Sequence, residues 1–365
     1  MDAGSENIVV YNDYVKEQLK NRHVIDDPGL FYAQIFFELA NTPRVGYRQG
    51  SAIVSVAQDV DANDTTGGIV WESAYLLLDY LLALSCQMDK LKQSHQSIKM
   101  IDLGAGVGLL GLVLSCVGMF DVTLTEYDDE TSSISPTSDS VVSSGVYALL
   151  EANVKAHNYE KRQGLLTGKE VTVHRLDWTK PFEETPACWD ATKATDHKYD
   201  LVVGTDVVFT PSLVRPLLRT AASLTESSGR CVLCMQIRCA ESHELLLTCA
   251  SEYFDCVTDI SEEVYCTEGC DWGRAMECLV FELKGPRVVD DSLIMRGLDS
   301  LRPALDDEGR PSDKKRKASD GADSQSPGVD SGAAVIDTRW RRRKEEAGGV
   351  GSSGIGPSNA GNSIE

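Results

Sequence analysis

Three glycines at alternate positions follow an acidic residue in the segment MIDLGAGVGLLGL, residues 100–112. The apolar residues before Gly104 are typical of a buried strand, and those after Gly108 of a helix. A glycine turn between a strand and a helix lets a ligand approach the backbone closely, because no Cβ intervenes. The helix that follows offers free N–H groups at its start. The segment therefore predicts a site for a nucleotide-like ligand.

The spacing of the glycines separates the candidate ligands. A nucleoside triphosphate site needs Gly-Lys-Ser/Thr at the end of the loop, which is absent, and a dinucleotide fingerprint needs a third glycine where Leu109 stands. The chain instead reads Asp-x-Gly-x-Gly-x-Gly, with Asp102 followed by Gly104, Gly106 and Gly108. An acid at the strand end repels a pyrophosphate and attracts a cation. S-adenosylmethionine fits this pattern because it carries a sulfonium and an ammonium group.

Further polar residues follow later strands. Glu126, in TEYDD, could accept hydrogen bonds from both hydroxyls of a ribose, although dinucleotide folds place an acid similarly. Asp177 could cap a helix, and Trp178 beside it offers a flat face to an adenine ring. Asp206 follows the apolar run YDLVVG, where an acid is costly unless it meets a partner. A lysine ammonium or a cofactor amine would be such a partner.

The elements that must position these residues alternate along the chain. Strands are expected within residues 51–58, 99–103, 121–127, 170–178, 199–209, 229–237 and 275–283, and helices within 70–84, 108–118, 145–158, 211–224 and 241–254. This alternation predicts an α/β fold with a mainly parallel sheet and helices on both faces. Ligands bind at the carboxyl ends of the strands in such sheets, which is where the polar residues above fall.

Charge and composition divide the chain. The formal net charge is −21, and residues 285–365 hold 13 basic and 14 acidic residues, so the acidic excess lies before them. That tail is rich in Gly, Ser, Asp and Pro and is expected to be disordered. Two basic clusters in it, 314–317 and 339–344, resemble nuclear-import signals, although solvated charge runs would look the same. The polar segment 128–145 is interpreted as a surface insertion. An acidic body disfavours nucleic acid and anionic membranes.

The 11 cysteines and the N-terminus indicate a location. The first residues lack a signal-peptide pattern, and no apolar run is long enough to span a membrane. We therefore expect a cytoplasmic protein with free thiols, possible nuclear entry and no membrane partner. The pairs in CVLC, 231–234, and CTEGC, 266–270, have no partner pair at zinc-finger spacing, so no metal site is expected.

Six segments in order along the chain carry a family resemblance: GGIVWESAYLLLDYL, MIDLGAGVGLLGL, VTLTEYDD, LLEANVKAHN, HRLDWTKP and YDLVVGTDVVFTPSLVRPLL. They resemble the seven-β-strand protein lysine methyltransferases, which modify Hsp70-type chaperones, the p97-type ATPase and translation elongation factors. The resemblance covers residues 53–284. It implies a Rossmann-like class I methyltransferase fold with a seven-stranded sheet. It also implies S-adenosyl-L-methionine as cofactor and a lysine of a non-histone protein as acceptor.

The resemblance also implies a set of site residues. Those expected at the cofactor are Trp71, Asp102, Gly104, Gly106, Gly108, Glu126, Asp177 and Trp178. From the residues alone, Trp71 is as readily a core aromatic. Asp206 and Phe209 match the first and last positions of the family motif D-x-x-Y, and we expect them to be catalytic. Asp206 would orient the acceptor amine and Phe209 would form a wall of its channel. Phe209 keeps the ring of the family tyrosine and lacks its hydroxyl.

The expected organisation is an N-terminal extension with short strands over 1–68, a methyltransferase domain over 69–284 and the tail over 285–365. The expected partner is a chaperone, ATPase or translation factor, and the chain is expected to be a monomer. Two alternatives stay open: a small-molecule methyltransferase of the same fold, and an inactive methyltransferase-like binding module. The loop TDVVFTPS lacks the Pro pair typical of nucleobase and glutamine methyltransferases. A histidine or an N-terminal amine also remains open as acceptor, and a dinucleotide oxidoreductase is the weakest reading.

Overall fold

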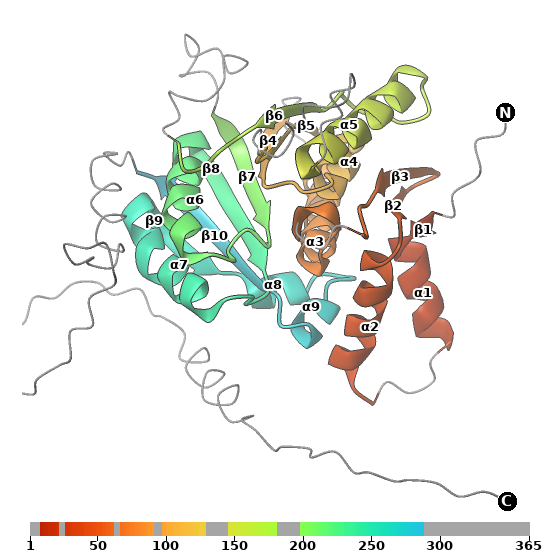
Figure 1. Cartoon of the computed structure of the whole chain (residues 1–365), viewed down its shortest axis with the longest axis horizontal. Coiled ribbons are helices and arrows are strands. Elements are labelled where there is room, and N and C mark those ends of the chain that lie inside the picture. The colour runs from red at the N-terminus through yellow and green to blue at the C-terminus, as the bar shows by residue number, and fades with distance from the viewer. Residues whose placement is uncertain are drawn as a thin grey trace, which may run out of the picture. The chain divides into compact units, whose positions relative to one another are not determined.

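A computed structural model describes residues 8–21, 26–61, 66–90, 97–128, 145–180 and 198–287 (Figure 1). Almost all of the polar insertion expected at 128–145 lies outside these ranges. The tail from residue 288 onward, with both of its basic clusters, also lies outside them. The described residues belong to one compact unit, so the arrangement of the sheet, the helices and the pocket below concerns that unit alone.

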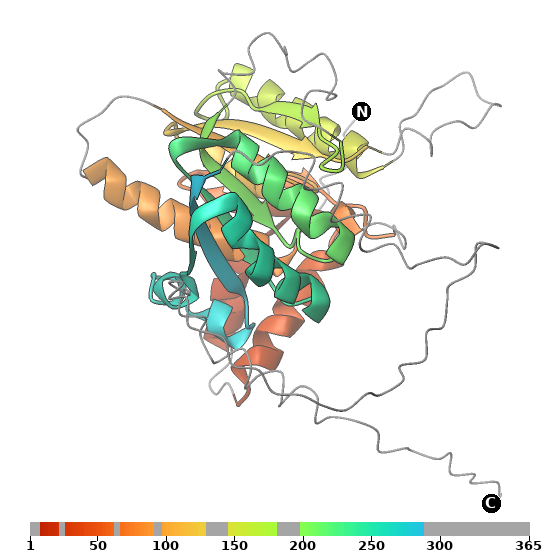
Figure 2. The ribbon, with the colours of Figure 1, turned by 90° about the vertical axis from the view of Figure 1, so that its left-hand side faces the viewer.

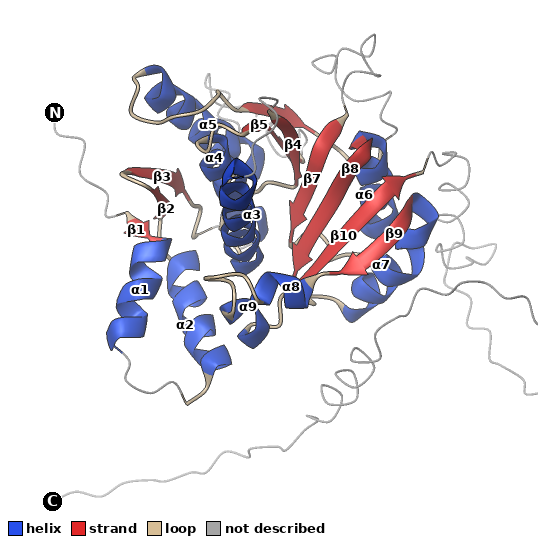
Figure 3. Cartoon of the chain, turned by 180° about the vertical axis from the view of Figure 1, so that it is seen from behind, coloured by secondary structure: helices blue, strands red, loops and turns tan. Residues whose placement is uncertain are grey.

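The main sheet has seven strands in the order β6-β5-β4-β7-β8-β10-β9 (Figure 3). Their bounds are β4 (Ile98–Leu103), β5 (Phe120–Glu126), β6 (Thr172–Arg175), β7 (Tyr199–Thr205), β8 (Thr225–Met235), β9 (Phe254–Asp259) and β10 (Leu279–Pro286). Strand β10 is antiparallel to both of its neighbours, and the other pairs are parallel. The order reverses beside β4, which pairs with β5 on one side and β7 on the other. Such a reversal opens a crevice for a ligand at the strand ends.

Helices cover both faces of this sheet. Helices α6 (Pro211–Leu224) and α7 (Ala240–Tyr253) cover one face, toward the viewer in Figure 2, and α3 (Glu72–Lys90), α4 (Leu109–Ser115) and α5 (Val146–Arg162) cover the other. Alternate residues of one strand face opposite ways: Val202 joins the core under α6 and α7, whereas Leu201 and Val203 join the core under α3 to α5. Two buried faces explain the continuous apolar strands in the sequence. The expected Rossmann-like α/β fold, with seven mainly parallel strands between helices, is confirmed.

The N-terminal residues build a second layer against α3. Strands β1 (Val9–Val10), β2 (Arg44–Gln49) and β3 (Ala52–Ala57) form a three-stranded sheet, accompanied by α1 (Tyr11–Asn21) and α2 (Pro28–Ala40). The ring of Tyr11 stacks on Tyr75 of α3, with ring centroids 4.2 Å apart. The hydroxyls of Tyr11 and Tyr47 donate hydrogen bonds of 3.0 and 2.7 Å to Asp79 of the same helix. The strand expected at 51–58 is therefore part of a larger element than the sequence predicted.

Some elements depart from the sequence expectation. Helix α7 ends at Tyr253, and the following residues form β9 at the edge of the main sheet, where no strand was expected. The short helices α8 (Ser261–Tyr265) and α9 (Trp272–Ala275) lie in the connection from β9 to β10 and were not expected either. Among the helices that the structure describes, none has the length and apolar character needed to cross a membrane.

Candidate active site

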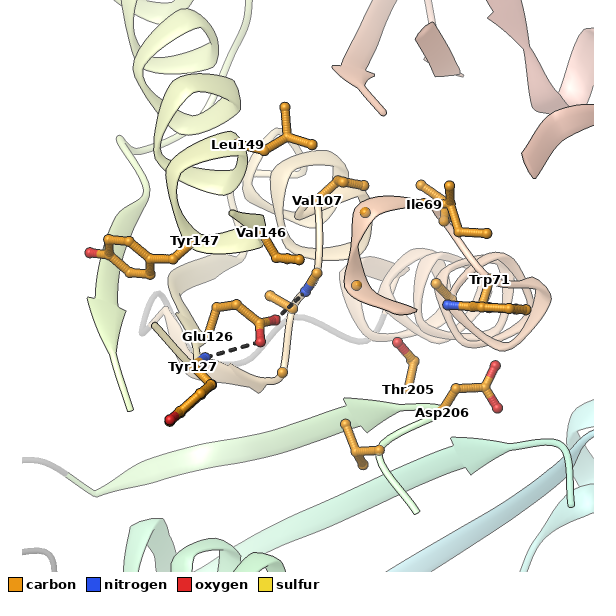
Figure 4. A pocket seen from close by; sticks show the side chains of 18 of the residues that line it. Ile69, Trp71, Val107, Glu126, Tyr127, Val146, Tyr147, Leu149, Thr205 and Asp206 are labelled. Carbon is orange, nitrogen blue, oxygen red and sulfur yellow. Dashed lines mark hydrogen bonds between the residues drawn. The ribbon is translucent and has the colours of Figure 1, made fainter. Parts of the chain in front are cut away.

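A pocket of about 1010 Å³ lies at the carboxyl ends of the parallel strands (Figure 4). Eight of the ten predicted site residues line it: Trp71, Gly104, Gly106, Glu126, Asp177, Trp178, Asp206 and Phe209. Asp102 and Gly108 are not among its described lining residues. The fold therefore brings residues from the ends of β4, β5, β6 and β7, together with the start of α3, to one cavity.

The glycine loop follows β4 and turns sharply into α4. Gly104, Gly106 and Gly108 have φ values of 68°, 56° and 91°, in the left-handed region that favours glycine. A Cβ on Gly106 would lie 3.0 Å from the carbonyl oxygen of Gly67, so the loop passes directly against a neighbouring turn. A Cβ on Gly108 would lie 2.6 Å from Leu150, which shows that Gly108 serves the packing of α4 and α5.

Glu126 ends β5 and holds the glycine loop through its carboxylate. Oε2 accepts a hydrogen bond of 2.7 Å from the Gly106 N–H, and Oε1 accepts one of 3.0 Å from the Tyr127 N–H (Figure 4). Burial raises the pKa of Glu126, and these two N–H donors lower it. A carboxylate has about four acceptor positions, so Glu126 keeps capacity for further donors inside the pocket.

Asp102 lies beneath the loop rather than on the pocket wall. It is 1% exposed, and its Oδ1 has no hydrogen-bond partner among the described residues. Burial and the nearby charge of Glu126 raise the pKa of Asp102 to about 8. The sequence predicted a carboxylate that meets a cationic ligand. In the folded chain, burial and the charge of Glu126 favour the protonated form of this acid, so its meeting with a cationic ligand stays a prediction.

Asp177 and Trp178 follow β6. The Asp177 Oδ1 accepts hydrogen bonds from the N–H and the hydroxyl of Thr179, at 2.9 and 2.6 Å, which closes a tight turn. A Cβ on Gly104 would lie 3.3 Å from the Trp178 ring, so the indole lies beside the glycine loop. Arg219 of α6 donates a hydrogen bond of 2.5 Å to the Trp178 carbonyl oxygen, which holds this segment against α6. The result is a flat aromatic wall next to the loop.

Asp206 follows β7 at the other end of the pocket, with a φ of 53° that is unusual for a non-glycine residue. Its Oδ1 accepts a hydrogen bond of 2.9 Å from the Gln236 N–H. Its Oδ2 accepts bonds of 2.8 Å from Ser73 Oγ and 3.2 Å from Arg238 Nη2. The sequence predicted a lysine or a cofactor amine as partner for this acid, whereas the chain itself supplies an arginine. Phe209 is 41% exposed and lines the same pocket.

Trp71 immediately precedes α3 and faces the pocket (Figure 4). The guanidinium of Arg238 lies over its ring, 4.7 Å from the ring centroid. The same group is 2.5 Å from Oε1 of Glu72. The sequence analysis did not predict Arg238, Glu72 and Ser73, because each lies more than 30 positions from Asp206 in the chain and no local spacing relates them to it.

The two cysteine pairs differ in their burial. Cys231 and Cys234 are fully buried in β8, and burial raises the pKa of both thiols. In the second pair, Cys266 is exposed and Cys270 is buried. Across the described ranges, no group of three or more His, Cys, Asp or Glu side chains is arranged to hold a metal ion.

Comparisons with known proteins show the family of the chain. A family model described as lysine methyltransferase matches residues 51–252. The protein N-lysine methyltransferase METTL21A of Xenopus tropicalis is 26% identical over 198 residues, which are 53% of this chain and 74% of the relative. Its counterpart in Danio rerio is 27% identical over 49% of this chain and 65% of the relative. The histidine protein methyltransferase 1 homolog of Bos taurus is 23% identical over 61% and 58%.

Solved structures overlap the chain more loosely. The METTL16 MTase domain is 15% identical, with a TM-score of 0.38 over 63% of this chain and 72% of that chain. A fibrillarin/NOP5P complex is 12% identical, with a TM-score of 0.35 over 66% and 97%. The assignment rests on the family model, which covers more than half of the 365 residues. The chain belongs to the lysine methyltransferase family.

Proposed function

We propose that this chain transfers a methyl group from S-adenosylmethionine to the side-chain nitrogen of a lysine in another protein. The observation that carries the proposal is the hydrogen bonding of Glu126 to the glycine loop inside the pocket at the strand reversal. The family assignment and the names of the two METTL21A relatives support lysine as the acceptor.

The residues of the pocket fit S-adenosylmethionine. A cavity of about 1010 Å³ is large enough for a ligand of this size. The remaining acceptor positions of Glu126 suit ribose hydroxyls, and the Trp178 ring suits an adenine face. The buried, unpartnered Oδ1 of Asp102 offers a polar atom close behind the loop. When bound, S-adenosylmethionine supplies a methyl group on a sulfonium, already activated for transfer.

The chain's own contribution is mainly positional, since an activated methyl group needs no acid or base from the protein to leave. The acceptor amine must be neutral to attack. Apolar surroundings lower the pKa of a lysine and a carboxylate raises it. Asp206 orients the amine from one side of the pocket, and Phe209 forms an apolar wall that also attracts a cation. No dedicated general base is required.

A histidine acceptor is the second candidate, favoured by the likeness to the histidine protein methyltransferase 1 homolog. A neutral imidazole already presents an unprotonated nitrogen at pH 7 and needs no deprotonation. The two candidates share the cofactor and differ in the methylated residue, so analysis of the product separates them.

The proposal extends to the kind of protein that is methylated. Because the acidic excess lies before residue 285, a basic surface around the methylated lysine would complement this chain. The sequence resemblance suggests that the target is a chaperone, an ATPase or a translation factor. We also propose that the enzyme is monomeric and cytoplasmic. Mass spectrometry of the labelled target tests the class directly.

The test is methyl transfer from tritiated S-adenosylmethionine into the proteins of a cell lysate, run with the wild type and with Asp206→Ala. One discrete labelled band with the wild type, weakened with the variant, supports protein methylation. Labelled methyllysine after acid hydrolysis of that band supports a lysine acceptor. Labelled methylhistidine supports a histidine acceptor instead. Saturable cofactor binding without any labelled protein contradicts a protein substrate and favours a small molecule or a binding module.

A further inference from the structure

Arg238 lies between two buried carboxylates on the wall of the pocket. Its Nη2 is 2.5 Å from Oε1 of Glu72 and 3.2 Å from Oδ2 of Asp206. The carboxylate side chains are 8% and 6% exposed, whereas that of Arg238 is 33% exposed. We call this group of three residues the Arg238 bridge. One cation therefore balances two acids that are almost removed from water.

The Arg238 bridge joins three separate elements at the acceptor end. Arg238 lies in the connection from β8 to α7, Glu72 begins α3, and Asp206 follows β7. The guanidinium also covers the ring of Trp71, 4.7 Å from its centroid. A planar guanidinium can bond to carboxylates in its plane and stack on an aromatic ring across that plane, which an ammonium cannot do. The position of Asp206 therefore depends on Arg238 as well as on its own strand.

The charges explain why the bridge needs a cation. Burial raises the pKa of Glu72, Arg238 lowers it, and the charge of Asp206 raises it. Among the described residues, the thiols of Cys234 and Cys278 also interact electrostatically with these carboxylates. Burial raises the pKa of both thiols, so they are neutral at pH 7 and cannot replace the guanidinium. Two adjacent buried carboxylates without a cation would not both stay ionised.

We propose that Arg238 is a positioning residue for methyl transfer, which holds the Asp206 side chain in place against Glu72 and Trp71 at the acceptor end of the pocket. This inference rests on the proposed function. The guanidinium has a second effect in the same place: a cation close to the acceptor amine disfavours the protonated form of that amine. Asp206 can then orient the amine without holding it as an unreactive ammonium.

The first measurement is the thermal unfolding midpoint, Tm, of the protein without cofactor from pH 5 to pH 8. In Arg238→Gln the pKa of Glu72 in the folded state should rise further above its unfolded value. The variant is then stable at low pH, where Glu72 is protonated, and loses stability as the pH increases. We expect the Tm deficit against the wild type to grow with pH and reach about 6 °C or more at pH 8. Adding Glu72→Gln removes one of the two carboxylates, and the growth with pH should disappear.

The second measurement is the initial rate of methyl incorporation into lysate proteins, together with the KM for S-adenosylmethionine. Arg238→Gln should lower kcat by about tenfold or more at pH 7 and change KM by less than about threefold, because misplaced groups at the acceptor end affect chemistry rather than cofactor binding. The Glu72→Gln/Arg238→Gln double variant should recover part of that loss. Arg238→Lys keeps the charge and lacks the planar fork, so it should keep the wild-type pH dependence of Tm with an intermediate rate.

Two results would overturn the inference. One is a Tm deficit of Arg238→Gln that is the same at pH 5 and pH 8 and is not relieved by Glu72→Gln. The other is an unchanged kcat in Arg238→Gln while the wild type is active. Failure of the proposed function looks different, since the wild type itself would then neither bind S-adenosylmethionine nor label lysate proteins. The Tm series would still decide whether Arg238 balances the two carboxylates.

Discussion

The two ends of the pocket hold their key carboxylates in different ways. Glu126 accepts hydrogen bonds from two backbone N–H groups, one in the glycine loop and one on the next residue. Asp206 accepts bonds from two side chains, Ser73 and Arg238, in addition to one backbone N–H. In the first arrangement the donors are backbone groups, so it depends on the conformation of the loop. The second depends on the identity of residues that are far apart in the chain.

This difference has a functional consequence under the proposed mechanism. Cofactor capture at the Glu126 end uses a loop shape that many sequences can adopt, provided that the glycines are kept. The acceptor end uses a charged network of side chains, which can change with the substrate. Substitutions at the two ends should therefore separate binding of the cofactor from transfer to the acceptor.

The largest effect is expected for Asp206→Ala. Transfer should fall by about 100-fold, because the group that orients the acceptor is lost, while the Kd for S-adenosylmethionine changes by less than about threefold. Calorimetric titration and methyl incorporation measure the two quantities. Asp121→Ala, an exposed acid at the start of β5, is the matched control and should change neither. If Asp206→Ala loses cofactor binding as well, Asp206 belongs to the cofactor end and the comparison fails.

A smaller effect, at the other end, is expected for Glu126→Gln. Loss of a charged acceptor for the loop N–H groups and for the ribose hydroxyls should weaken cofactor binding by about tenfold or more. The rate at saturating cofactor should stay within about threefold of the wild type. Glu151→Gln on the exposed face of α5 is the control, since its carboxylate pairs only with Lys155 in the contacts described. An unchanged Kd would remove Glu126 from the cofactor site.

Asp102 is a third carboxylate, next to the Glu126 end. Burial and the charge of Glu126 raise its pKa to about 8, and no cation among the described residues lowers it. The folded pKa lies above the unfolded value, so the stability that protonated Asp102 contributes is present at low pH and is lost as the pH rises toward 8. Asp102→Asn lacks this titration. Its stability relative to the wild type should increase by about 1.4 kcal/mol per pH unit between pH 5 and pH 8. The free energy of unfolding of both proteins is measured by chemical denaturation at each pH. A constant difference between the two proteins from pH 5 to pH 8 would show instead that Asp102 is charged in the folded state.

The smallest effect is expected for Phe209→Tyr. The ring is 41% exposed, so an added hydroxyl can reach water without a burial cost. The rate of transfer and the pattern of labelled proteins should stay within about threefold of the wild type. A large gain in rate, or a new labelled band, would show that the missing hydroxyl matters for the choice of acceptor.

The sequence predicted those parts of the molecule that rest on local patterns. The strand that contains Asp102, the glycine turn that follows it and the alternation of strands and helices follow from hydrophobic period and from the lack of a Cβ in glycine. Short strands were expected over 1–68, one of them within 51–58, and β3 lies there. Their pairing into a three-stranded sheet was not predicted, because the first strand has two residues, Val9 and Val10, and pairs with a strand that begins at Arg44. Strand β9 escaped because an edge strand exposes much of its surface and carries little apolar alternation.

The candidate site divides in the same way. Glycine spacing and the acid after the next strand located the Glu126 end. The Arg238 bridge could not be predicted, since ion pairs between residues more than 30 positions apart leave no spacing in the sequence. Arg238 lies between the strand expected within 229–237 and the helix expected within 241–254, where the sequence does not distinguish it from an exposed charge in a loop. Only the fold brings it to Asp206.

The most direct test measures cofactor binding and methyl transfer for Glu126→Gln and Asp206→Ala side by side, with tritiated S-adenosylmethionine and one lysate. We expect opposite effects: Glu126→Gln binds the cofactor weakly and regains its rate when the cofactor is saturating, whereas Asp206→Ala binds the cofactor normally and stays slow. If both variants lose binding and rate together, the pocket does not have separate cofactor and acceptor ends.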